Sequence, residues 1–211
     1  MGIKERRERE KDATRVRILD AARELFAALG YEGVSMRGIA QKIEYSPTVI
    51  YQYFTDKDAL IQELCYADFR KLADQLQSSL QTPDPIERLR ICGAQYVRFA
   101  MENPNHYRLM FMTPYPAGEL TPELAEAKGK PESDAYALVR FLVQAASEQG
   151  ALRDPTANLD LVAQTLWAGL HGVIALNIAL SCDDWTDWQP IEERATAMLD
   201  ALSHGLFAEK K

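Results

Sequence analysis

Residues 35–57 read SMRGIAQKIEYSPTVIYQYFTDK, and this stretch decides how the rest of the chain is interpreted. Ser35 is a good N-cap, and the apolar residues that follow repeat at helical spacing, which predicts a helix of about nine residues. Ser46 and Pro47 place a capping residue before a proline at the first helical position, which predicts a second short helix that ends at Phe54. Two short helices joined by so tight a connection match a helix-turn-helix.

The outer face of the second helix is polar and aromatic and contains no acidic residue. Thr48 and Gln52 on this face can pair with the edges of bases, and the hydroxyls of Tyr51 and Tyr53 can donate to phosphates. The residues therefore suit a DNA groove. The alternative is a solvated helix face whose tyrosine rings lie along the surface of the protein.

Two basic residues flank this helix. Arg37 lies in the first turn of the preceding helix, where its guanidinium can bind a guanine edge through two hydrogen bonds. Lys57 lies at the start of the following helix, whose backbone N–H groups already favour an anion. The sequence Thr55-x-x-Asp58 at that start resembles a capping box with Asp in place of Glu.

The remaining sequence has the same helical periodicity and no sustained strand-type alternation, which predicts an all-α fold of about nine helices. Gly30 stands where a left-handed C-terminal cap of the first helix belongs. Prolines mark most later starts and breaks. The helices expected after the helix-turn-helix are one long helix that starts near residue 56, and further helices near residues 85–102, 105–112, 131–149, 157–181 and 190–208.

Charge is divided unevenly along the 211 residues. The whole chain has a formal net charge of −7, which by itself argues against a nucleic-acid partner. Residues 1–57 nevertheless hold 11 Lys and Arg against 9 Asp and Glu, whereas residues 58–211 hold 13 against 22. The two parts differ in sign and are therefore expected to differ in partner.

The cysteine pattern and the N-terminus favour a cytoplasmic protein. Cys65, Cys92 and Cys182 are far apart and form no CxxC motif, as expected in a reducing compartment. No apolar signal segment precedes residue 18. Residues 161–182 lack Asp, Glu, Lys and Arg over a length that can span a bilayer, but their polar side chains and acidic flanks favour a helix buried in protein.

The order of these features resembles the tetracycline-repressor (TetR) family of bacterial transcriptional regulators. The resemblance runs from about Arg15 to Leu64 and rests on ILDAARELFAALGYEGVSMRGIAQKI, a short turn, Ser46, IYQYF and DKDALI. It implies that Tyr51 and Lys57 clamp phosphates and that Ser35 caps the first helix of the motif. The residues that it implies face bases or the adjacent sugar and phosphate are Arg37, Pro47, Thr48, Gln52 and Tyr53, with Ser46 beside them.

Two residues depart from the family pattern. Glu44 occupies a turn position where the family usually has Gly, so it must either adopt a left-handed conformation at a cost of about 1 kcal/mol or shift the turn. Val49 replaces a common Thr and loses a hydroxyl that can donate to phosphate.

The C-terminal part of such regulators typically binds a small molecule and forms a dimer. Here Trp167, His171 and Gly172 resemble the Trp-x-x-x-His-Gly motif of one C-terminal subclass. Asp160, Gln164, Trp167 and His171 share one helix face, which can line a mostly apolar cavity. The alternative is a hydrogen-bonded core histidine beside a packed tryptophan.

A second group of candidate cavity residues is rich in Met and aromatic side chains, which form adaptable apolar walls. Ordinary core packing is the alternative for each of them. The expected effector is a small apolar or amphipathic molecule. The group consists of Phe99, Met101, Tyr107, Met110, Phe111, Met112 and Tyr115.

The last helix carries Ile191, Ala195, Met198, Leu202 and Leu206 as one apolar stripe. With the nearly apolar helix before it, this stripe is expected to form a four-helix interface between two subunits. Gly169 and Gly172 suit close approach within that interface. A dimer reads a palindromic operator in double-stranded DNA, with half-sites about 34–36 Å apart.

The resulting organisation is a mobile charged arm at residues 1–12, a DNA-binding helix-turn-helix domain at residues 13–57 and a helical ligand-binding and dimerisation domain at residues 58–211. The function expected is that of a homodimeric repressor released by its effector, with an activator or an architectural DNA binder as alternatives.

Two other functional classes, an enzyme and a membrane-anchored protein, have less support in the sequence. An all-α enzyme lacks support because the sequence has no HExxH, paired Glu-x-x-His, GxGxxG, P-loop or CxxC motif, so no cofactor and no metal are expected. The hypothesis of a membrane-anchored helical protein rests on residues 161–182 alone.

Overall fold

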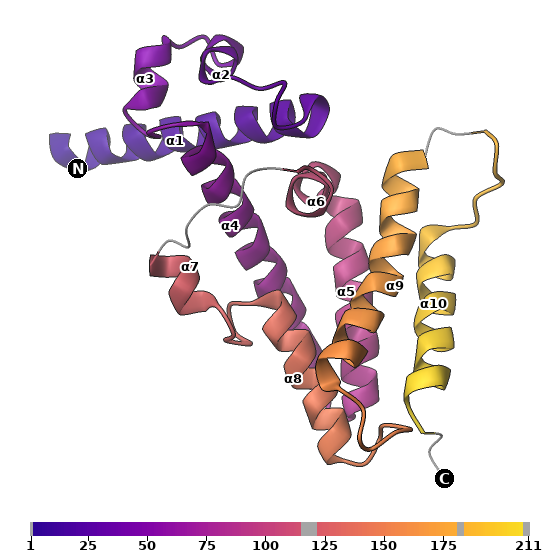
Figure 1. Cartoon of the computed structure of the whole chain (residues 1–211). Coiled ribbons are helices and arrows are strands. Elements are labelled where there is room, and N and C mark those ends of the chain that lie inside the picture. The colour runs from indigo at the N-terminus through magenta and orange to yellow at the C-terminus, as the bar shows by residue number, and fades with distance from the viewer. Residues whose placement is uncertain (1, 115–121, 181–183, 209–211) are drawn as a thin grey trace. The chain divides into compact units, whose positions relative to one another are not determined.

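The computed structural model describes residues 2–114, 122–180 and 184–208. In these ranges the chain forms ten α-helices and one short 3-10 helix, with no β-strand, as Figure 1 shows. The expected all-α fold class is confirmed. The chain divides into two compact units, one made of Met1–Asp68 with Asn105–Thr121 and the other of Phe69–Pro104 with Pro122–Lys211.

The first unit is built on α1 (Ile3–Leu29), which packs against α2 (Met36–Lys42), while α2 packs against α3 (Pro47–Tyr51). The first part of α4 (Lys57–Leu76) and most of α6 (Pro104–Phe111) complete it. Burial of apolar side chains at helical spacing holds these short helices in place. The fully buried members of this core include Ile18, Phe26, Ile39, Ile50, Leu60 and Ile61.

The N-terminal segment differs from expectation. Residues 1–12 were expected to form a mobile charged arm; α1 begins at Ile3 and continues without a break to Leu29, so the described part of this arm is helical, and its mobility stays a prediction. Residues 4–12 are all charged, and the Lys, Arg and Glu residues among them are themselves good helix formers, so they extend the helix beyond its packed part. Gly30 ends α1 with a φ of 69° and a ψ of 175°, so it has the positive φ that favours glycine but lies outside the left-handed helical region that was expected. Its N–H donates to the Phe26 carbonyl over 2.9 Å.

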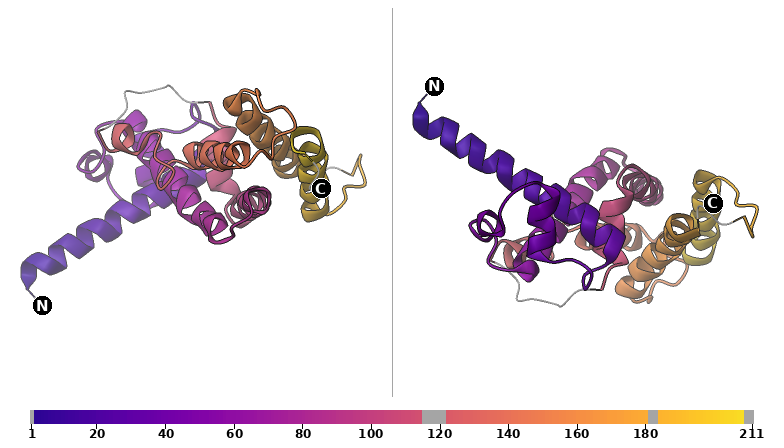
Figure 2. Two further views of the ribbon diagram at one scale, coloured as in Figure 1. Left: turned by 90° about the horizontal axis from the view of Figure 1, so that it is seen from below. Right: turned by 90° about the horizontal axis from the view of Figure 1, so that it is seen from above.

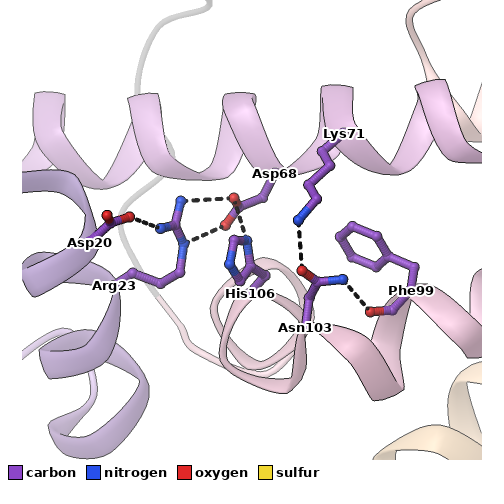
Figure 3. A network of polar contacts seen from close by, with 7 residues as sticks. All are labelled: Asp20, Arg23, Asp68, Lys71, Phe99, Asn103 and His106. Atoms are coloured by element: carbon purple, nitrogen blue, oxygen red, sulfur yellow. Dashed lines mark hydrogen bonds and ion pairs between the residues drawn. The ribbon is translucent and has the colours of Figure 1, made fainter. Parts of the chain in front are cut away.

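A buried carboxylate joins three helices of the first unit (Figure 3). Asp68 of α4 is 2% exposed and accepts from the Arg23 guanidinium of α1 at 3.0 and 3.3 Å. The Nδ1 atom of His106 in α6 lies 2.7 Å from the same carboxylate. Arg23 also binds the exposed Asp20 one turn earlier. Buried charges of this kind persist only where partners satisfy them.

The second unit contains η1 (Gln77–Gln81), α5 (Pro85–Glu102), α7 (Pro122–Ala127), α8 (Ala135–Glu148), α9 (Leu159–Leu180) and α10 (Ile191–Leu206). Helix α9 contacts α5, α8 and α10, and α5 contacts α8 and α10, so these four helices lie side by side (Figures 1 and 2). Asp84 and Asp134 cap α5 and α8 with their carboxylates. At the end of α5, Asn103 accepts from Lys71 over 2.7 Å and donates to the Phe99 carbonyl (Figure 3).

The apolar stripe of α10 packs inside its own chain. A Cβ atom placed on Gly169 of α9 would lie 2.6 Å from Leu202 and 3.2 Å from Met198. Gly169 is therefore required for close approach of α9 and α10, and the stripe that was expected at a subunit interface covers α9 of the same chain. A Cβ atom on Gly172 would meet nothing within 4 Å, so this glycine faces an open side of α9.

Most helix boundaries agree with the sequence-based expectation, and the main addition is α7, in a stretch where no helix was expected. Helix α9 is long and apolar enough to cross a bilayer, with a mean hydropathy of 1.4 over its most apolar window. In the second unit it packs against three neighbours, and 39% of this window is buried.

Candidate nucleic-acid interface

The connection between α2 and α3 is a tight turn that fixes the angle of entry into α3. The Ser35 hydroxyl accepts from the Gly38 N–H over 3.1 Å and caps α2 as expected. At the other end of α2, the Tyr45 N–H donates to the Ala40 carbonyl and the Glu44 N–H to the Gln41 carbonyl. These two bonds form a Schellman motif, whose C′ position requires a left-handed residue.

Glu44 occupies that left-handed position with a φ of 61°. Of the two possibilities for this residue, the turn therefore keeps its geometry and Glu44 adopts the strained conformation. A side chain with a Cβ atom in this region costs roughly 1–2 kcal/mol relative to the right-handed region.

Replacement of Glu44 by Gly is expected to raise the free energy of unfolding by about 1 kcal/mol, because glycine adopts positive φ without the Cβ penalty. Urea denaturation of the two proteins at one concentration measures the difference. Glu44→Ala removes the same charge but keeps the Cβ atom, so it separates strain from electrostatics. Equal free energies of unfolding for Glu44→Gly and Glu44→Ala would contradict backbone strain at position 44.

Helix α3 is the element that presents the candidate base-reading residues. Ser46 stands at its N-cap position without a side-chain cap hydrogen bond, and Pro47 is its first helical residue. The regular helix ends at Tyr51, earlier than expected, although the N–H groups of Tyr53 and Phe54 still donate to the Ile50 carbonyl. The last turn is therefore tightened rather than absent.

Burial separates the two faces of α3 as the sequence predicts. Ile50 is fully buried and Phe54 is 4% exposed, whereas Tyr51 is 55% exposed. The polar face is free of acidic residues and open to solvent, with Tyr53 half-buried at its edge. The exposed candidates are Ser35, Arg37, Ser46, Pro47, Thr48, Tyr51 and Gln52.

Lys57 is held at the start of α4 by the loop after α1. Its ammonium donates to the Tyr31 carbonyl over 2.9 Å and lies 3.8 Å from the centre of the Tyr31 ring. The Tyr31 hydroxyl donates to the Asp58 carboxylate, and this bond raises the pKa of Tyr31 to about 12. The cap of α4 is Asp56, which accepts from the Ala59 N–H over 2.7 Å, so the expected box starting at Thr55 is not formed.

Two arginines of α1 brace both ends of α3, and the sequence interpretation missed them. The Arg17 guanidinium donates to the Tyr45 hydroxyl over 3.2 Å and stacks on that ring, just before α3 begins. The Arg15 guanidinium lies 4.7 Å from the centre of the Phe54 ring and pairs with Glu63 of α4. Both arginines lie within three residues of Ile18, the first buried apolar residue of α1, and this position was the available signal.

The candidate effector residues of the first unit belong to α6. Tyr107 is fully buried and Met110 is 7% exposed, and the Tyr107 and Phe111 rings lie 4.8 Å apart. These three residues therefore form packed apolar structure in α6. Tyr115 lies outside the described residues.

The candidate effector residues of the second unit lie on α5 and α9. Phe99 is fully buried, and the Met101 sulfur accepts from the Asn177 side chain over 3.5 Å. Trp167 is 39% exposed and donates from Nε1 to the Tyr96 hydroxyl over 2.9 Å. Gln164 is exposed.

The face of α9 that Asp160, Gln164 and Trp167 share lies toward α8. Asp160 and Gln164 both bond the Tyr136 hydroxyl of α8, whose ring also lies near Trp167. Burial lowers the pKa of His171 below its usual value, so this imidazole stays neutral over more of the acidic range. In the described part of the chain, no group of three or more His, Cys, Asp or Glu residues is arranged to hold a metal ion.

Comparison with known proteins agrees with this geometry. Residues 18–64 match the family model described as bacterial regulatory proteins, tetR family, and residues 89–202 match that of the tetracyclin repressor-like C-terminal domain. The chain belongs to the TetR family. The first match contains the whole of α2 and α3, and the second covers more than half of the chain. The Trp-x-x-x-His-Gly subclass stays a prediction.

Curated TetR-type relatives match over part of their length. The HTH-type transcriptional regulator UidR of Escherichia coli K12 is 35% identical over 94 residues, which are 44% of this chain and 42% of UidR. The repressor KstR of Rhodococcus jostii is 30% identical over 43% of this chain and 42% of its own. The activator FasR of Mycolicibacterium smegmatis is 32% identical over 50% and 48%. The chain thus spans less than half the length of each.

Solved structures share the fold over nearly the whole chain. A TetR family transcription regulator from Marinobacter aquaeolei VT8 has a TM-score of 0.73 at 20% identity and covers 96% of this chain and 100% of its own. The fatty acid degradation regulator FadR from Bacillus halodurans has a TM-score of 0.70 at 20% identity, with 89% and 93% covered. These likenesses show the TetR fold.

Proposed function

We propose that this TetR-family protein is a homodimeric DNA-binding regulator that represses transcription from a palindromic operator and is released by a small effector. The observation that carries the proposal is the exposed, acid-free face of α3, with Thr48 and Gln52 available to bases and Tyr51 available to phosphate. The Ser35 cap and the turn at Glu44 fix the position of this face against α1.

Dimerisation is supported by an open stripe on α9. Leu161 and Leu176 are 64% and 48% exposed, and the residues between them on this face are small. An apolar stripe with a small centre allows a second helix to approach closely, and α10 offers small exposed residues beside it. The stripe consists of Leu161, Thr165, Ala168, Gly172 and Leu176, and the small residues of α10 are Ala197, Ala201 and Gly205.

The effector is proposed to be small and apolar or amphipathic. Phe99, Met101 and the α9 face of Gln164, Trp167 and His171 supply apolar walls with a few polar groups in the second unit. Tyr107, Met110, Phe111 and Tyr115 are the other candidates. Effector binding acts on operator affinity only through a difference in affinity between two conformations of the protein.

Repression is proposed over activation, and the relatives named above include one repressor and one activator. The protein is proposed to act in the cytoplasm on DNA, without a membrane, a cofactor or a catalytic step of its own.

The role of α3 is tested by Gln52→Ala in the full chain, with DNA from upstream of its own gene. Loss of a bidentate base contact is expected to weaken operator binding by about 1–3 kcal/mol and to relax specificity at one position of each half-site. Fluorescence anisotropy with single-base operator variants measures both effects.

Gln81→Ala is the matched control, because it makes the same chemical change at an exposed residue of η1 in the second unit. The control is expected to bind as the wild type does. Equal operator binding by Gln52→Ala and Gln81→Ala would show that α3 does not read bases through Gln52.

A further inference from the structure

The first three turns of α1 project beyond the packed part of the first unit. The side chains of residues 4–13 are exposed, and Ile18 is the first fully buried residue of the helix. At 1.5 Å per residue, the stretch from Ile3 to Arg17 is about 22 Å long. Figure 1 shows the N-terminal end of α1, in indigo, extending beyond α3.

Helical spacing sorts the charges of this projection into stripes. Residues 3–17 contain seven Lys and Arg against four Asp and Glu. Residues three and four positions apart share a face of an α-helix. One basic stripe is formed by Arg6, Arg9 and Arg17, with Ala13 and the acidic Glu10 on the same face. A second is formed by Lys4, Arg7, Lys11 and Arg15, and an acidic stripe by Glu5, Glu8 and Asp12.

The first basic stripe leads to the N-terminal end of α3. Its last member, Arg17, binds the Tyr45 hydroxyl, and Tyr45 directly precedes the N-cap of α3. The second stripe instead ends at Arg15, which pairs with Glu63 of α4. In a helix-turn-helix the N-terminal residues of the second helix reach the base edges, so the first stripe lies on the side where the duplex is expected.

We propose that Arg6 and Arg9, continued by Arg17, form an accessory surface that binds the phosphate backbone of the same duplex. This inference rests on the proposed function. Guanidinium groups bind phosphate through two parallel hydrogen bonds. Arg6 now pairs with Glu10 one turn away, but both side chains are more than 60% exposed, so this pair contributes little and can be exchanged for phosphate.

The accessory surface compensates for the low net positive charge of the helix-turn-helix domain. A net charge of only +2 over residues 1–57 supplies little non-specific attraction, and the α3 face itself carries no Lys or Arg. Arginines beside it add affinity without sequence information, because phosphates are the same at every base pair. Part of the sequence-independent affinity is thus assigned to α1, while the base contacts stay with α3.

Two double variants of the full chain test this assignment. Arg6→Gln with Arg9→Gln removes two of the three arginines of the first stripe, and Arg7→Gln with Lys11→Gln removes the same charge from the second. All four residues are exposed and Gln is a good helix former, so the helix is retained. Operator affinity is measured between 50 and 300 mM salt for each protein.

Four arginines are lost per dimer in the first variant, so the slope of log affinity against log salt is expected to flatten by roughly 3–4. Affinity is expected to fall tenfold or more at low salt, while the ranking of operator variants stays unchanged. The second variant is expected to keep a slope close to that of the wild type.

The outcomes separate this inference from the proposed function. If the wild type shows no sequence-specific binding, both are wrong. If the wild type binds specifically and the two double variants behave alike, only the accessory surface is wrong. A change in operator ranking for the first variant would assign these arginines to bases and overturn the phosphate contact.

Discussion

Asp68→Asn is expected to lower the free energy of unfolding by about 3 kcal/mol, because it leaves the Arg23 charge buried without its partner. The Arg23 side chain is only 13% exposed, and Asp68 accepts two of its hydrogen bonds and contacts His106. An amide of the same shape cannot neutralise the guanidinium. Urea denaturation at a fixed protein concentration measures the loss.

Asp20→Asn is the matched control for this prediction. Asp20 binds the same guanidinium at 3.0 Å, but its side chain is 62% exposed. Exposed ion pairs contribute about 0–1 kcal/mol, so the control is expected to change stability little. If both variants lose the same small amount, the buried carboxylate does not hold α1, α4 and α6 together.

The second large effect is expected from Ala168→Glu on the open side of α9. In the proposed dimer this substitution places a carboxylate from each subunit in an apolar interface, where it is desolvated without a partner. The variant is expected to be monomeric, and its operator affinity is expected to fall at least 100-fold, because one subunit reads only one half-site. Sedimentation velocity and operator titration measure the two effects.

Ala125→Glu makes the same change at an exposed position of α7 and is expected to leave both properties unchanged. A dimeric Ala168→Glu protein that still binds the operator would show that the interface lies elsewhere. Circular dichroism checks that both variants keep the helical fold.

The sequence predicted the helix-turn-helix because its signals are local. Ser35 and the Ser46-Pro47 pair act within one turn of their own helices, and the apolar residues of α2 and α3 lie on faces set by helical geometry alone. The same holds for the polar face of α3. Local rules predicted the helix to Phe54 but not that its last turn is tightened through bonds to the Ile50 carbonyl.

Features that depend on contacts between distant segments were harder to predict from the sequence. Asp68 follows Leu64 and precedes Leu72 on the buried stripe of α4, so its position was a signal for a buried acid, but its partners come from other helices. The apolar stripe of α10 was correctly placed on one face, yet periodicity cannot say whether that face meets the same chain or another. Gly169 decides this through its contact with Leu202.

The most direct test of the central claim is competition binding of the full chain to DNA from upstream of its own gene against the same DNA with the palindrome scrambled. At 0.15 M salt the operator is expected to be preferred by roughly a thousandfold or more, with one dimer bound per palindrome. Equal affinity for the two DNAs across the salt range, or no binding to either, would contradict it.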